Sequence, residues 1–144
     1  MSVVHKFTGK FGELYKWDGA RFRRYGEGAS KGATETWLIG KAEQAGNFAI
    51  RYYELEPGGY SREEQHEHDH GIVFMRGSGE VHLGDEIVPV SEGDVVYISP
   101  NDRHQIINTG EGILGWLCVI PAHRPKGGKT VWAEEGLDGL TTTR

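Results

Sequence analysis

Between residues 47 and 121, short runs of apolar and β-branched residues alternate with groups of turn-forming residues. The runs end at glycine, proline, asparagine or aspartate, for example at Pro57-Gly58-Gly59, and these residue types favour tight turns. The runs cover residues 48–55, 72–76, 80–83, 86–90, 95–98, 105–108 and 113–120. Short strands that recur about every ten residues are typical of a β-sandwich or barrel. Since no segment has a convincing helical period, we expect an all-β fold.

The first 45 residues are polar and glycine-rich, but they carry many aromatic side chains. These are Phe7, Phe11, Tyr15, Trp17, Phe22 and Tyr25. Disordered segments are poor in aromatic residues. We therefore interpret residues 1–45 as an arm of short strands that packs on a barrel of residues 46–123 or on a dimer partner. Residues 124–144 are predicted to form a polar C-terminal tail.

Composition narrows the class of protein. The chain has 144 residues, enough for one domain, and a formal net charge of −5, which disfavours binding to nucleic acid or to an anionic membrane. Its 22 glycines are about twice the usual share, which agrees with many turns. Cys118 is the only cysteine, and no apolar signal segment or membrane-spanning run is present. We therefore expect a cytoplasmic protein without disulfides.

Histidines and carboxylates gather in one short segment. His66, His68 and His70 lie within five residues, and His104 begins a later predicted strand. Imidazole and carboxylate groups are common ligands of first-row transition metals. Alternate residues of a strand share a face, so Glu64 and His66 can point together, and a turn can bring His70 back beside them. With His104 they would supply three nitrogens and one oxygen to one divalent transition metal per chain.

The spacing of this segment resembles the first motif of the cupin superfamily. That motif is Gly, five residues, His-x-His, three or four residues, Glu, six residues, Gly. Here Gly58, Glu64, His66, His70 and Gly77 occupy the corresponding positions. The first His is replaced by Glu64 and the Glu by His70, so the inventory of three His and one Glu is kept.

A second cupin motif is also recognisable. It reads Gly, five residues, Pro-x-Gly, two residues, His, three residues, Asn, and its positions hold Gly93, Ser99, Asn101, His104 and Asn108. The resemblance covers about residues 48–121 and implies a small double-stranded β-helix, the jelly-roll barrel of single-domain cupins. It implies a metal bound by Glu64, His66, His70 and His104. Two alternatives stay open: Glu64 acts only as a support for a histidine, or His68 takes its place.

Further residues are candidates near the metal because of the strand faces that they share. Trp116 and Cys118 share a face of the last strand. In small cupins with a similar aromatic-x-Cys-x-Ile-Pro ending, the aromatic and the cysteine side chains point towards the metal. Tyr97 is close to a motif position. Arg51 either points inward, where it could bind a substrate carboxylate, or is an outward surface charge, and we favour the second.

The resemblance implies a fold more firmly than a reaction, because cupins host many activities. We expect a metal-dependent enzyme, dioxygenase-like or an isomerase or lyase, that acts on a small organic acid, diketone or sugar acid. Iron, manganese or nickel are favoured as the metal, and zinc is an alternative. A non-enzymatic cupin that binds or senses a small ligand is the second hypothesis. We also expect a homodimer.

Overall fold

The computed structural model describes residues 2–10 and 12–143, so Phe11 of the predicted arm lies outside the described residues. The elements are almost all strands. They are β1 (Arg21–Arg24), β2 (Lys31–Ile39), a 3-10 helix (Lys41–Glu43), β3 (Phe48–Tyr60), β4 (His70–Arg76), β5 (Ser78–Leu83), β6 (Glu86–Ser91), β7 (Val95–Ile98), β8 (His104–Ile107), β9 (Leu114–Pro121), β10 (His123–Lys126), β11 (Lys129–Trp132) and β12 (Thr141–Thr142). The all-β prediction is confirmed, and each predicted run overlaps a strand.

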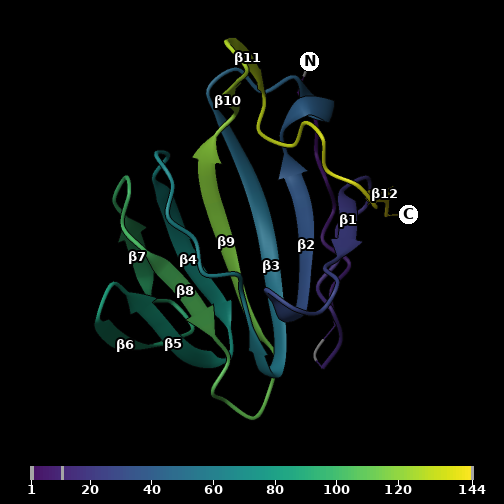
Figure 1. Ribbon diagram of the computed structural model, residues 1–144. Coiled ribbons are helices and arrows are strands. Elements are labelled where there is room, and N and C mark those ends of the chain that lie inside the picture. The colour runs from purple at the N-terminus through teal and green to yellow at the C-terminus, as the bar shows by residue number, and fades with distance from the viewer. Residues whose placement is uncertain (1, 11, 144) are drawn as a thin grey trace.

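The long strand β3 joins two branches of antiparallel pairing. On one branch the strands pair in the order β3, β9, β4 and β7. On the other, β3 meets β8, which leads to β5 and β6. Figure 1 shows β2, β3 and β9 side by side, with the shorter strands β5, β6 and β8 to their left. The two branches enclose a core that includes Leu55, Phe74, Ile98 and Leu114.

Pro57-Gly58-Gly59 does not end the strand, contrary to the prediction from its turn-forming residues. The strand β3 continues to Tyr60, which pairs with Ile107 of β8. Gly58 has a φ of 77°, in a region where residues with a side chain are strained. A Cβ on Gly59 would lie 2.6 Å from the carbonyl oxygen of Lys31. The glycines therefore kink the strand and carry it from one branch to the other.

The predicted arm supplies two strands to the main sheet. The strand β2 pairs with β3 along most of its length, and β1 pairs with β2 and β12. Residues 33–38 of β2 are all buried, because Leu38 packs with Ala20 and Tyr52 on one face while Trp37 joins the main core on the other. The alternation that marks a half-exposed strand is therefore missing. The division at residues 45 and 123 stays a prediction.

The C-terminal residues fold back over the barrel. The hairpin of β10 and β11 follows β9 directly, and Ala133 and Leu137 pack against the main core. Within the described residues, no helix has the length and apolar character needed to cross a membrane.

Candidate metal centre and its cavity

Three histidines from separate parts of the barrel meet at one point. His70 begins β4, His104 begins β8, and His66 lies in the segment between β3 and β4. One ring nitrogen of each lies within 4.8 Å of the others. The backbone of Glu64 pairs with that of His104 through two hydrogen bonds of 2.9 Å. This bridge holds the histidine segment against β8.

Hydrogen bonds on the far side of each ring orient the histidines. Nδ1 of His66 lies 2.9 Å from the carbonyl oxygen of His68, and Nδ1 of His104 lies 2.8 Å from that of Asp102. A carbonyl only accepts, so each Nδ1 carries the hydrogen and each Nε2 keeps its lone pair. Nδ1 of His70 lies 3.0 Å from Sγ of Cys118, which can accept in the same way.

The donor set fits a transition metal. Nε2 of His66 and Nε2 of His70 lie only 2.9 Å apart, and two facing lone pairs at this distance repel each other unless a cation or a proton lies between them. Two nitrogens bound at right angles to one ion, each at about 2.1 Å, are about 3 Å apart. The cluster of His66, His70 and His104 could therefore hold one metal ion.

The choice of a fourth ligand stays a prediction. Oε2 of Glu64 lies 3.3 Å from Nε2 of His66, and the Glu64 side chain is 45% exposed. The ring of His68 stacks on that of His66, with centroids 3.7 Å apart. Both side chains line the same cavity. Glu64 is next to Nε2 of His66, whereas His68 stacks against the ring face.

Burial keeps two of the imidazoles neutral. Burial, followed by the positive charge of Arg51, lowers the pKa of His70 to about 2. Burial, followed by the neighbouring His66, lowers the pKa of His68 to about 4. Neutral imidazole is the form that binds metals and accepts protons.

A cavity of about 480 Å³ opens beside the histidines. Its apolar wall includes Leu55, Ile72, Ile106 and Trp116, and Ala133 and Leu137 of the C-terminal segment contribute to it. Trp116 and Cys118 line the cavity together, as the shared strand face predicts. Tyr97 does not line it. Tyr97 alternates with the buried Ile98, so its side chain is 62% exposed on the outer face, where the hydroxyl donates to Asp69 at 2.7 Å.

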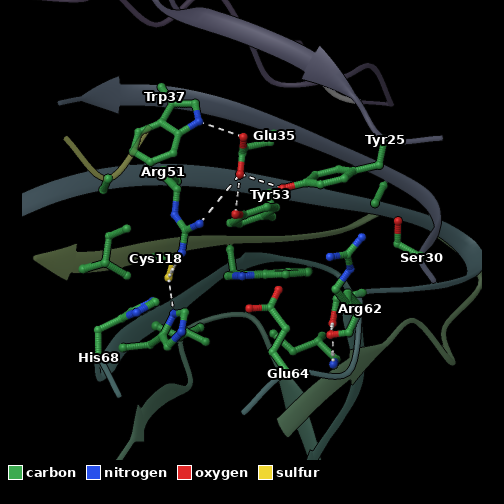
Figure 2. A pocket seen from close by; sticks show the side chains of 18 of the residues that line it. Tyr25, Ser30, Glu35, Trp37, Arg51, Tyr53, Arg62, Glu64, His68 and Cys118 are labelled. Atoms are coloured by element: carbon green, nitrogen blue, oxygen red, sulfur yellow. Dashed lines mark hydrogen bonds and ion pairs between the residues drawn. The ribbon is translucent and has the colours of Figure 1, made fainter. Parts of the chain in front are cut away.

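Arg51 points inward, so the outward orientation that we favoured is wrong. Its Nη2 lies 3.3 Å from Sγ of Cys118, and its Nη1 lies 3.7 Å from Oε2 of Glu35. The guanidinium also lies over the rings of Trp37 and Tyr53. Figure 2 shows Arg51 between Glu35 and Cys118.

The buried Glu35 of β2 was not expected from the sequence. Its carboxylate accepts hydrogen bonds from Tyr53 at 2.5 Å, Tyr25 at 2.7 Å, Trp37 at 2.7 Å and Arg23 at 2.8 Å. Burial alone would raise the pKa of Glu35, but Arg51, Tyr53 and Arg23 outweigh it and hold the pKa below its usual value. The Thr-Glu-Thr-Trp run was the available signal, because Glu35 and Trp37 share a strand face.

Comparisons with known proteins agree with this architecture. The model of the cupin domain family matches residues 51–120. Over 119 residues the chain is 32% identical to the 1-methylthio-D-xylulose 5-phosphate methylsulfurylase of Rhodospirillum rubrum, covering 81% of this chain and 75% of that enzyme.

Solved structures give the same picture. A cupin-2 domain protein from Rhodospirillum rubrum superposes with a TM-score of 0.73 at 29% identity, over 87% of this chain and 82% of that one. A cupin 2 conserved barrel domain protein from Rhodopseudomonas palustris superposes with a TM-score of 0.69 at 34% identity, over 76% and 77% of the two chains.

Proposed function

The chain belongs to the cupin domain family, and from that premise we propose that it is a metal-dependent enzyme acting on a small organic molecule. The observation that carries the proposal is the convergence of one ring nitrogen from each of His66, His70 and His104 beside a cavity of about 480 Å³, which His70 and His104 line. Ligand sites are usually concave, mostly apolar and provided with a few polar groups. This cavity combines an apolar wall with several polar and charged side chains.

Residues His66, His70 and His104 would hold the metal, with Glu64 or His68 as a fourth ligand. A bound metal would supply Lewis-acid chemistry or, with iron, the capacity to use dioxygen. We favour iron, manganese or nickel, with zinc as an alternative. A small organic acid, diketone or sugar acid fits the size of the cavity, and oxygenase, isomerase and lyase reactions are the candidate classes.

The protein's own side chains have separable tasks in such a reaction. Trp116, Ile106 and Leu55 exclude water from the bound substrate. With Glu64 as the fourth ligand, His68 faces the cavity as an imidazole that can accept a proton from the substrate. Such a proton-transfer group beside the histidines favours an enzyme over a passive ligand binder. The name of the Rhodospirillum rubrum relative, a methylsulfurylase, supports the same choice.

Elemental analysis of protein purified without a His-tag tests the metal centre. We expect about one transition metal per chain in the wild type, and its loss in His104→Ala. His82→Ala is the matched control, because His82 lies outside the cluster and pairs with Glu80. No metal in the wild type, even after anaerobic loading with iron, manganese, nickel and zinc, would contradict the proposal.

Turnover of a panel of small organic acids, diketones and sugar acids tests the activity. We expect a product from the metal-loaded wild type and none from His104→Ala, as followed by mass spectrometry. A compound that binds the metal-loaded wild type tightly and is recovered unchanged would instead support the non-enzymatic, ligand-sensing alternative.

A further inference from the structure

The cavity wall beside the histidine cluster contains a buried excess of positive charge. Glu35 supplies one negative charge, and Arg23 and Arg51 supply two positive charges next to it. Their side chains are only 1%, 16% and 13% exposed, respectively. An unpaired charge in such a position is costly unless another group compensates for it.

The tyrosines around Arg51 do not supply the missing negative charge. Burial raises the pKa of Tyr53 far above its usual value and that of Tyr25 to about 12, so both hydroxyl groups are neutral near pH 7. Glu64 lies next to His66 at the histidine cluster.

The two arginines differ in how they are satisfied. Arg23 donates directly to Glu35 at 2.8 Å and to the hydroxyl of Tyr25 at 2.9 Å, so it is the structural partner of the carboxylate. Arg51 has no oxygen acceptor within hydrogen-bond distance among the described residues. Its Nη2 donates to the sulfur of Cys118, and its buried Nε has no partner. A buried guanidinium is rarely left in this state.

The position of Arg51 is nevertheless fixed. Its guanidinium lies over the rings of Trp37 and Tyr53, at 5.4 and 5.0 Å from their centroids. A guanidinium held in place can donate to a carboxylate or a phosphate without a further loss of conformational freedom. The remaining charged residues of the cavity wall add to the attraction, because Arg62 and Arg124 outnumber Glu64.

We propose that the ligand of this cavity carries an anionic group, a carboxylate or a phosphate, which Arg51 binds beside the histidine cluster. The inference rests on the proposed function, because it takes this cavity as the place where the substrate reacts. It narrows the substrate class to organic anions. Organic acids, sugar acids and phosphate esters then remain as candidates, and neutral diketones do not.

Titration calorimetry on metal-free protein tests the anion site separately from the metal centre. The probes are malonate, its neutral analogue malonamide, and inorganic phosphate, at constant ionic strength. We expect malonate or phosphate to bind the wild type and malonamide to fail. Tighter malonate would identify a carboxylate ligand and tighter phosphate a phosphate ester. Arg51→Met should weaken anion binding about ten- to hundredfold, the usual effect of losing hydrogen bonds to a charged group.

Two control variants make the result specific. Arg103→Met removes an exposed arginine that pairs with Asp85 outside the cavity wall, and it should bind anions like the wild type. Arg23→Met should lower the melting temperature of the ligand-free protein, whereas Arg51→Met should leave it unchanged or raise it. A melting temperature that falls equally in both would make Arg51 a structural partner of Glu35 and overturn the proposal.

Two other outcomes also reject the anion site. These are equal binding of malonate and malonamide, and undiminished anion binding by Arg51→Met. Because these titrations use metal-free protein, a failure of the metal analysis leaves them interpretable. Conversely, a metal centre without anion binding would reject only this inference.

Discussion

The sulfur of Cys118 lies 3.0 Å from Nδ1 of His70, on the side of the ring away from the histidine cluster. Acceptors in this position fix the tautomer of a metal-binding histidine, and their loss costs about 10- to 100-fold in metal affinity. We therefore expect Cys118→Ala to bind metal about tenfold more weakly in a chelator competition, and Cys118→Ser to keep most of the affinity. Equal affinities in all three proteins would contradict this role.

The neutral His70 makes the stability of the metal-free protein depend on pH. Its pKa is about 2 in the folded protein and about 6.5 in an unfolded chain. Below about pH 6.5 the unfolded state therefore binds a proton that the folded state does not bind. The free energy of unfolding then falls by up to about 1.4 kcal/mol per pH unit as the pH drops. Urea unfolding at pH 7 and pH 5 measures the loss, and His70→Asn should reduce it.

The carboxylate of Glu35 organises one side of the cavity. Its folded-state pKa is lowered, so its stabilising contribution is present at neutral pH and is lost as the pH falls through the folded-state value. We expect Glu35→Gln to cost about 3 kcal/mol at pH 7 and less in acid. Glu80→Gln, on a partly exposed pair with His82, should change stability by less than about 0.5 kcal/mol. Urea unfolding of both variants is the measurement.

Arg76 fastens the N-terminal segment to the outer face of the barrel. It donates to the carbonyl oxygen of Glu13 at 2.6 Å and to the buried carboxylate of Glu54 at 3.1 Å, and it lies over the ring of Tyr15. Because Arg76→Ala would leave Glu54 buried without its counter-charge, we expect a loss of about 3 kcal/mol. Faster proteolysis within residues 2–20 would accompany it, and Arg103→Ala should show neither effect.

An apolar patch lies on the outer face of β4, β7 and β9, and we propose that a second copy of the chain covers it. Val73, Val95, Tyr97 and Val119 are 38–72% exposed there, and strand pairing places them side by side. Contiguous exposed apolar surface often marks an interface. We expect a homodimer by light scattering at micromolar concentration, and a monomer after Val95→Lys. A monomeric wild type would contradict the proposal.

Motif spacing located the histidine cluster because the three histidines lie at fixed offsets from glycines that the turns require. Gly77 shows this dependence, since a Cβ there would lie 2.2 Å from the carbonyl oxygen of Ile113. Such local constraints can be recognised from the sequence alone. The kink at Pro57-Gly58-Gly59 is different, because the same residues serve to end a strand or to bend one. Only pairing with β8 decides between them.

The orientation of Arg51 and the burial of Glu35 could not be predicted for a related reason. Alternation shows which residues of a strand share a face but not which face is inward. On β3 both faces are covered, because Arg51, Tyr53 and Leu55 face the cavity while Tyr52 and Glu54 lie beneath the N-terminal segment. A strand enclosed on both sides loses the polar and apolar contrast that sequence patterns depend on.

The C-terminal segment that supplies Ala133 and Leu137 to the cavity contributes none of the three clustered histidines. In the proposed enzyme, the place where a bond is made or broken is therefore separate from part of the surface that selects the molecule. Changes in residues 122–140 can reshape that surface without moving the ring nitrogens of the histidine cluster. Under the proposed function, proteins built on this plan can diverge in the molecules that they bind while the histidine cluster is kept, and replacing this C-terminal segment is a route to altered selectivity.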